Sequence, residues 1–291
     1  MKKKMGIIFL LLTAAFALSA CNVAGDGFNQ NREINVISRE TGSGTRDAFI
    51  ELVGVQVRDG GGNVVDQTSS EAYIAPGTSI VLSRVETNVY AIGYLSLGSL
   101  NDSVRAVPIN GVLPTTASVQ NGTYPIFRTF NLVVPSEISD LALDFIGFIL
   151  SAEGQAVVEG RRYVPVASNA PAYNGPHGMT GTVVVLGSTS VAPVMEHLKE
   201  AYEAINPGVT IEVQSAGSSA GINAARDGLA DIGMSSRELT DSELAVLGSI
   251  PIAFDGVAVI VHNDNPISGL TIEQVRQIFV GDITRWSGVN E

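Results

Sequence analysis

Residues 38–46 read Ser38-Arg39-Glu40-Thr41-Gly42-Ser43-Gly44-Thr45-Arg46, and this stretch decides our prediction of the fold. It follows a strand-like run at residues 34–37 and opens an amphipathic helical pattern at residues 43–53. Two later turns, Gly187-Ser188-Thr189-Ser190 and Gly217-Ser218-Ser219-Ala220-Gly221, share this strand–turn–helix design. A helix N-terminus presents unpaired N–H groups that attract anions, and serine and threonine cap it with hydroxyls. If the three turns converge, they form an oxyanion site with almost no net charge.

Arg39 is the candidate counter-charge for such a site, because arginine donors match the geometry of tetrahedral oxyanions. The alternative is a surface arginine paired with Glu40 or Asp47. Arg46 and Arg237 are further candidates, and each is equally compatible with a solvated side chain.

Strand-like and helical segments alternate along the chain, which predicts an α/β protein with parallel-rich sheets. Residues 59–70 are rich in Gly, Asn and Ser and are expected to form a loop. A long helical pattern covers Asp140 to Val158, and a strong strand pattern covers Ile252 to Val261. Residues 167–181 contain several prolines and glycines and are the best linker candidate.

The charge balance argues against a nucleic-acid partner. The chain has 17 basic and 29 acidic residues. Removal of a leader holding Lys2, Lys3 and Lys4 leaves 14 basic residues and a net charge of −15. Nucleic-acid binding depends on basic patches, so an anion site in this chain must be built locally.

The N-terminus has the layout of a lipoprotein export signal. Three lysines precede an apolar run from Ile7 to Ala17, which is shorter than the roughly 20 residues of a spanning helix. Leu18-Ser19-Ala20-Cys21 fits a lipidation site, and Cys21 is the chain's single cysteine. We therefore expect a signal peptide at 1–21, lipidation at Cys21 and a tether at 22–33; the alternative is an ordinary signal peptide with a chance cysteine.

The enzyme alternative is a serine hydrolase, and the sequence does not favour it. The histidines are His177, His197 and His262, and no Gly-x-Ser-x-Gly elbow follows a strand. No group of His, Cys and carboxylates has metal-ligand spacing. We expect no catalytic residues, no metal and no cofactor.

The quoted turn, extended to Phe49, resembles the ligand loop of phosphate-binding proteins that serve Pst-type ABC importers. The resemblance spans residues 34–291, nearly all of the chain beyond the leader. Further segments that match this family are Ala91-Ile92-Gly93-Tyr94, Ser151-Ala152-Glu153-Gly154-Gln155, Gly187-Ser188-Thr189-Ser190, Gly217-Ser218-Ser219-Ala220-Gly221 and Asp231-Ile232-Gly233-Met234-Ser235-Ser236-Arg237.

The resemblance implies a two-lobed periplasmic-binding-protein-like fold, with two mixed or parallel-rich sheets, helices on both faces and a hinge between the lobes. It also implies which residues contact the ligand. Some family members carry an aspartate at the position of Ser236, where it accepts a proton from phosphate. Some pair the binding arginine with an acid two residues later, where this chain has Thr41. The implied ligand-binding residues are Arg39, Ser43, Gly44 and Thr45 from one lobe and Thr189, Ser190, Ser218 and Ser236 from the other.

The order of the segments differs from the family's usual order. Here the usual second part, about 34–166, comes first, and the usual first part, about 182–291, comes last. We interpret this order as a circular permutation in which linker 167–181 joins the old termini; a broken tandem or a truncated gene is the alternative. The implied lobes are 34–125 plus 262–291, called here the Arg39 lobe, and 126–261, called here the second lobe.

The function implied by the resemblance is capture of inorganic phosphate in an interlobe cleft and delivery to an ABC importer. The expected partners are phosphate, the permease and ATPase subunits, and the membrane through the lipid anchor. The expected location is extracytoplasmic, and the expected oligomeric state is a monomer. The alternatives are binding of sulfate or molybdate, and a ligand sensor or adhesion protein on the same fold.

Overall fold

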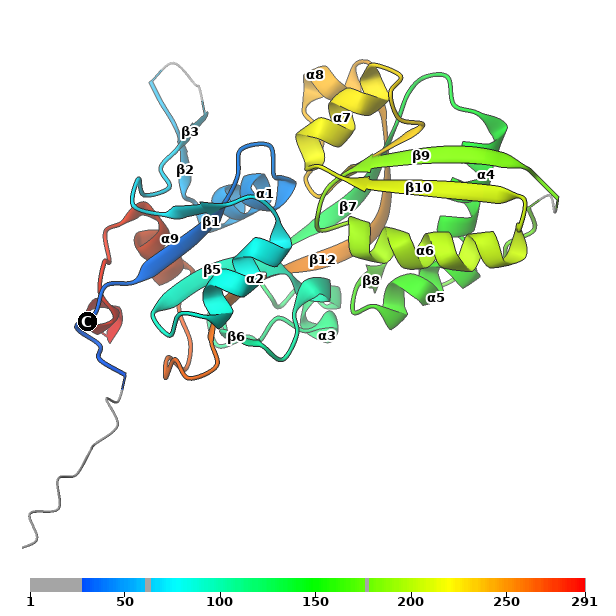
Figure 1. The fold of residues 1–291 in the computed structure, drawn as a ribbon. Helices are drawn as coiled ribbons and strands as arrows, with labels where there is room; N and C mark the ends of the chain where they lie inside the picture. The colour runs from blue at the N-terminus through cyan, green and yellow to red at the C-terminus, as the bar shows by residue number, and fades with distance from the viewer. Residues whose placement is uncertain (1–27, 61–63, 176–177, 291) are drawn as a thin grey trace, which may run out of the picture.

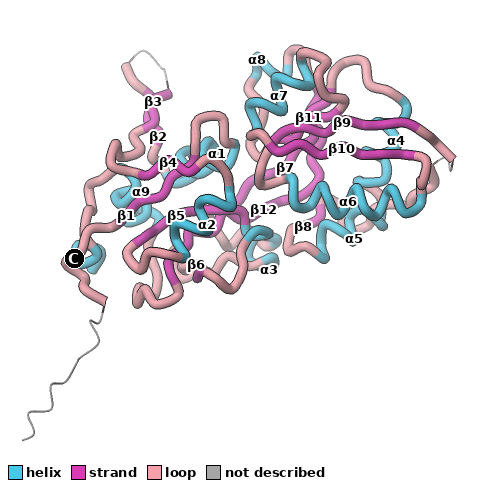
Figure 2. Tube along the Cα trace, in the orientation of Figure 1, coloured by secondary structure: helices cyan, strands magenta, loops and turns pink. Residues whose placement is uncertain are grey.

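The structure, a computed structural model, describes residues 28–60, 64–175 and 178–290. The strands follow one continuous path, β10-β9-β11-β7-β12-β5-β1-β4, which runs through both lobes (Figures 1 and 2). β12 (Gly248–His262) joins the lobes, because it pairs with β7 (Phe127–Val134) in one and with β5 (Ala91–Ser96) in the other. The predicted two sheets are therefore connected through a single long strand.

Each lobe also has its own set of elements. The Arg39 lobe contains β1 (Asn35–Arg39), α1 (Gly44–Val53), β2 (Gln56–Arg58), β3 (Val64–Asp66), β4 (Tyr73–Ala75), α2 (Thr78–Glu86), η1 (Leu97–Ser99), β6 (Val104–Ala106), α3 (Thr116–Gln120), α9 (Ile272–Val280) and η2 (Trp286–Asn290). The second lobe contains α4 (Asp140–Ile149), α5 (Ala152–Gly160), β8 (Val164–Pro165), β9 (Gly181–Gly187), α6 (Ala192–Ile205), β10 (Val209–Ser215), α7 (Ser218–Arg226), β11 (Ile232–Ser235) and α8 (Asp241–Leu244).

Helices cover both faces of the sheet, and the alternation of side chains along the strands explains why. On β12, Val257, Val259 and Val261 pack into the core beneath α1 and α9. Ala258 and Ile260 point to the opposite face, into the core beneath α2. A strand buried on both faces needs this continuous apolar run, which is the pattern that predicted it.

Two strands carry the chain between the lobes. On the first crossing, Ile126 belongs to the core of the Arg39 lobe and Phe130 to that of the second lobe. On β12 the core changes between Ala253 and Val257. The chain therefore passes into the Arg39 lobe before the predicted lobe boundary near Val261. The reason is that the last part of β12, from Val257 onward, already packs in the core of the Arg39 lobe.

A buried ion pair links these two crossing strands. Arg128 on β7 lies opposite Asp255 on β12, with 3.0 Å between Nη2 and Oδ2, and the side chains are 3% and 0% exposed. The Ser96 hydroxyl donates to the other carboxylate oxygen of Asp255 at 2.8 Å. Removal of one member of such a pair leaves an uncompensated buried charge.

Replacing Asp255 by alanine should therefore lower the free energy of unfolding by about 3–5 kcal/mol, measured by urea denaturation. Glu196→Ala is the control, since Glu196 lies 3.7 Å from Lys199 on the exposed face of α6 and should change stability by about 0.5 kcal/mol or less. Equal losses in the two variants would contradict the structural role of the buried pair.

Three segments differ from the sequence prediction. The pattern at Asp140 to Val158 forms two helices, because the Ser151 hydroxyl accepts from Gly154 N and starts a new helix. The expected loop at 59–70 contains β3, which forms a hairpin with β2. Residues 28–33 of the expected tether are fastened to the Arg39 lobe, since the Phe28 ring packs 5.1 Å from that of Tyr90.

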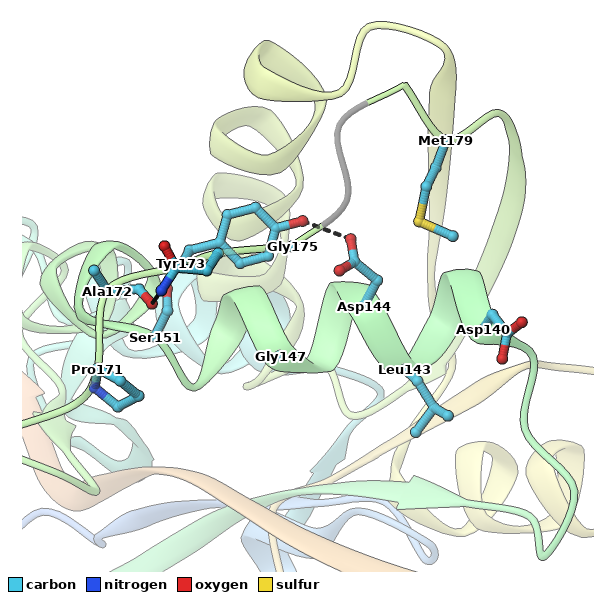
Figure 3. A pocket seen from close by; sticks show the side chains of 11 residues that line it. Asp140, Leu143, Asp144, Gly147, Ser151, Pro171, Ala172, Tyr173, Gly175 and Met179 are labelled. Atoms are coloured by element: carbon cyan, nitrogen blue, oxygen red, sulfur yellow. Dashed lines mark hydrogen bonds between the residues drawn. The ribbon is translucent and has the colours of Figure 1, made fainter.

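The predicted linker 167–181 has no helix and no strand among its described residues before β9 begins at Gly181. Its Tyr173 hydroxyl donates to Asp144 on α4 at 2.5 Å, as Figure 3 shows. Among the described residues, no single helix is long and apolar enough to cross a bilayer; α4 and α5 meet the length and composition together but are bent by 59°.

Candidate functional site

The eight predicted ligand-binding residues all lie between the two lobes, around the N-termini of α1, α6 and α7. Seven of them are buried, and Thr189 is partly buried. Because they come from both lobes and are enclosed, the lobes must separate before a solute can reach them. We call these residues, together with Thr78 and Ser188 described below, the hydroxyl cluster. In the structure the three turns lie together, and beside them are the residues that the resemblance implies as ligand-binding: Arg39, Ser43, Gly44, Thr45, Thr189, Ser190, Ser218 and Ser236.

Arg39, at the end of β1, is only 1% exposed. Its Nε and Nη2 donate to the two carboxylate oxygens of Glu40 at 2.7 and 2.8 Å, and Nη2 also donates to the Thr189 hydroxyl of the second lobe at 2.8 Å. Arg39 thus pairs with Glu40, as the alternative reading had it, but it is a buried residue of the cleft and not a surface arginine.

Glu40 holds the Arg39 guanidinium in place. The acid that the resemblance implies for some family members would stand one position later, where this chain has Thr41. Burial opposes ionisation of Glu40, but the hydrogen bonds and charge of Arg39 and the N–H of Gly77 keep its pKa below the ordinary value. The guanidinium is therefore already oriented, and it loses little conformational freedom when it contacts an anion.

The turn at the start of α1 brings backbone and hydroxyl groups close to the second lobe. Ser43 caps the helix by accepting from Arg46 N at 3.4 Å, and the Thr45 hydroxyl lies 2.7 Å from that of Ser190. A β-carbon built on Gly44 would collide with the Ser218 hydroxyl. A side chain here would have to displace the Ser218 hydroxyl, and a glycine allows the close approach without this displacement.

The second lobe contributes a group of linked serines. Ser218 Oγ accepts from Ser236 N at 3.1 Å and lies 3.3 Å from Ser236 Oγ. Ser188 donates to Ser236 Oγ at 2.9 Å. Ser188 was part of the quoted turn but was not predicted as a site residue; its position two residues before Ser190 on the same turn was the available signal.

Thr78 is a second residue that the sequence reading missed. It is the first residue of α2, and its hydroxyl accepts from Arg39 Nη1 and lies 3.3 Å from that of Thr189. The stretch Ala75-Pro76-Gly77-Thr78 ends a strand and begins a helix, so it repeats the design of the three recognised turns. Thr78 brings a fourth helix N-terminus to the cluster.

The other two candidate arginines have carboxylate partners outside the cluster. Arg46 pairs with Asp66 on β3, and it also donates to the carbonyl of Arg39. Arg237 is bound by both oxygens of Glu243 at 2.8 Å and by Asp47 at 3.1 Å. Hydrogen bonding from Arg237 lowers the pKa of Glu243 from 4.5 to about 2.

The two histidines in the described part of the chain have carboxylate partners outside the hydroxyl cluster. His197 contacts Glu200 on α6, and His262 contacts Asp264; His177 lies outside the described residues. A catalytic serine needs a base within hydrogen-bonding reach. Within residues 28–60, 64–175 and 178–290, no group of His, Cys, Asp and Glu could hold a metal ion.

A cavity of about 590 Å³ lies apart from the cluster, between α4 and the linker (Figure 3). Asp140 and Asp144 provide its charged groups, so an oxyanion would meet carboxylates there. The hydroxyl cluster is therefore the better candidate for an anion site.

The chain matches the PBP superfamily domain over residues 19–153 and 174–290. It is 44% identical to "Phosphate-binding protein PstS 2" of Streptococcus pneumoniae TIGR4 over 99% of both chains. It is 46% identical to the protein of the same name from Streptococcus agalactiae 2603 V/R, over 89% of this chain and 88% of that one. The match to "Phosphate-binding protein PstS" of Pseudomonas aeruginosa PAO1 is 38% identical over 117 residues, 38% of this chain and 36% of that one.

A solved structure gives the same family. The crystal structure of a phosphate ABC transporter, phosphate-binding protein from Streptococcus pneumoniae TIGR4, matches with a TM-score of 0.72 and 46% identity. The match covers 89% of this chain and 100% of that one. The chain belongs to the PBP superfamily and, within it, to the family of the phosphate-binding proteins of phosphate ABC transporters.

Proposed function

We propose that the protein captures inorganic phosphate between its lobes and delivers it to an ABC importer, without catalysing a reaction. The observation that carries this proposal is the position of Arg39, whose guanidinium meets hydroxyls of both lobes inside a buried cluster. A desolvated guanidinium among hydroxyl and backbone donors suits a small tetrahedral oxyanion. The streptococcal relatives, which are named phosphate-binding proteins, support phosphate as that anion.

Titration calorimetry with phosphate, sulfate and molybdate tests the choice of anion. We expect heat and thermal stabilisation with phosphate, since a ligand that binds only the folded state raises its stability. No response to phosphate, together with binding of sulfate or molybdate, would replace phosphate by that anion. No response to any of the three would favour the sensor or adhesion alternative.

Ser236 has a testable role in selecting among these anions. Its hydroxyl can both donate and accept, whereas a carboxylate at the same position can only accept when ionised. Ser236→Asp should accept a hydrogen bond from protonated phosphate and repel sulfate, which carries no proton at neutral pH.

We expect Ser236→Asp to raise the Kd of sulfate at least about tenfold more than that of phosphate, since an unpaired buried charge costs more than 1.4 kcal/mol. The Kd ratio of the two anions, measured by calorimetry in wild type and variant, gives the result. Ser242→Asp, at the exposed surface of α8, is the control. An unchanged ratio in Ser236→Asp would mean that residue 236 does not face the anion.

Lipid anchoring is part of the proposal and rests on sequence alone. Cys21 and the rest of the leader lie outside the described residues. We propose cleavage before Cys21, lipidation of its thiol and an extracytoplasmic, monomeric protein held at the membrane. Metabolic labelling with a radioactive fatty acid should mark the wild type and leave Cys21→Ser unlabelled; label in both would reject Cys21 as the site.

We also propose that the chain is a circular permutation of the usual order. The two ends of the described chain lie together, since Ile34 N donates to Thr284 O at 2.8 Å and Glu33 forms a bridge with Arg285. A direct continuation from the segment after Thr284 into Ile34 is therefore sterically reasonable. The order supports a tether attached to the Arg39 lobe, and the Streptococcus pneumoniae relative matches this chain along 99% of its length.

A further inference from the structure

An ion pair outside the hydroxyl cluster joins the two lobes. Arg237 follows Ser236 in the second lobe, and its Nε lies 3.1 Å from Asp47 Oδ2. Asp47 lies in the first turn of α1, whose N-terminus carries Ser43, Gly44 and Thr45. The pair therefore connects the two segments that present the anion-binding groups, and in Figure 1 α1 faces the α7–α8 region across the lobes.

Arg237 is held in a fixed position by its own lobe. Glu243 binds the guanidinium with both oxygens, and the same carboxylate accepts from Thr240 N at 2.8 Å to begin α8. The Arg237 carbonyl accepts from the Ser235 hydroxyl at 2.8 Å and from Asn131 at 3.4 Å. Glu243 leaves the Nε–H of Arg237 to pair with Asp47, and the fixed side chain loses little further conformational entropy when this pair forms.

The pair must break whenever the anion site opens. Ser190, Ser218 and Ser236 are fully buried, so an anion can reach them only after the lobes have moved apart. Asp47 is 37% exposed and Arg237 is 15% exposed in the closed arrangement, which makes the pair partly shielded from solvent. Beside it, Ser219 N donates to Gly42 O at 3.1 Å, so the lobes are in contact on this side of the cluster.

We propose that Arg237 and Asp47 are positioning residues that stabilise the closed lobes and slow the release of the bound anion. The inference rests on the proposed function for its ligand, inorganic phosphate. Neither side chain is required to touch the anion, because the pair acts by favouring the closed state to which the anion binds.

Asp47→Asn should raise the Kd of phosphate about fivefold, mainly through faster release, because a partly exposed ion pair contributes about 1 kcal/mol. Calorimetry gives the Kd, and displacement of radioactive phosphate gives the release rate. Asp227→Asn is the matched control, since Asp227 forms a 2.9 Å pair with Arg226 that stays within one lobe and is half exposed. Equal release rates for Asp47→Asn and Asp227→Asn would overturn the proposal.

A double variant tests whether the effect belongs to the pair. In a protein that already carries Arg237→Gln, Asp47→Asn should add no further increase in release rate. If Asp47→Asn still raises the release rate fivefold in that background, the effect of Asp47 does not depend on Arg237, and the proposal is overturned.

Small-angle X-ray scattering without phosphate separates this inference from the proposed function. We expect a larger radius of gyration for Asp47→Asn than for Asp227→Asn, because the first variant opens more readily. If the wild type fails to bind phosphate, the proposed function is wrong. The scattering difference then decides on the positioning role alone: a larger radius of gyration for Asp47→Asn supports that role, and equal radii overturn it.

Discussion

Replacing Arg39 by alanine is expected to raise the Kd of phosphate by at least about 100-fold, because removing one member of a buried charge pair costs about 3–5 kcal/mol. Arg39 is 1% exposed and contacts Glu40, Thr78 and Thr189. The variant loses the positive charge that an anion would face, and it also leaves the Glu40 carboxylate beside the site without its partner. Both effects act against an anion.

Arg276→Ala is the control for this measurement. Arg276 makes the same kind of forked contact with Glu273, at 2.7 Å, but on the surface of α9. It should bind phosphate as the wild type does, and titration calorimetry on both variants gives the comparison. Arg39→Lys should lie between the two, because lysine keeps the charge and loses the planar fork. Wild-type affinity in Arg39→Ala would remove Arg39 from the site.

Replacing Gly44 by alanine should weaken phosphate binding by about tenfold or more, through the approach of the lobes and not through charge. The added β-carbon would collide with the Ser218 hydroxyl and lie 2.8 Å from that of Ser236. Overpacking at a tight contact costs about 1–3 kcal/mol. Here the contact joins opposite lobes, so the cost falls on the closed state and therefore on the bound anion.

Gly147→Ala is the matched control for Gly44→Ala. Gly147 is an exposed glycine inside α4, and a β-carbon there meets nothing within 4 Å. It should leave the phosphate Kd unchanged and raise stability by about 0.5–1 kcal/mol, since alanine favours the helix. An affinity within twofold of the wild type in Gly44→Ala would show that the lobes close without this contact.

The binding turns could be predicted because their signal is local. A strand, a glycine and a capping hydroxyl are adjacent in sequence, and each turn sets its own helix N-terminus. Thr78 carries the same local signal, because it follows Gly77 and is the first residue of a helix. The convergence of these turns depends on which strands are neighbours, and that came from the family resemblance.

Other features depend on contacts that no short stretch reveals. Glu40 and Asp47 were both plausible partners of Arg39, and only the folded chain assigns Glu40 to Arg39 and Asp47 to Arg237. The continuous apolar pattern predicted one helix, but the chain ends α4 and begins α5 at Ser151. Ser151 stabilises this break because its hydroxyl caps α5 and also donates to Phe148 O at 2.6 Å. Phe28 was expected to belong to the tether, but in the structure its ring packs against Tyr90 and Trp286.

A crystal structure of the protein grown with phosphate tests the central claim most directly. The account predicts a tetrahedral anion between the closed lobes, within hydrogen-bonding distance of the Arg39 guanidinium and of hydroxyls from both lobes, including Ser43 and Ser218. Phosphate bound elsewhere on the protein, with Arg39 contacting only Glu40 and the two threonines, would contradict it.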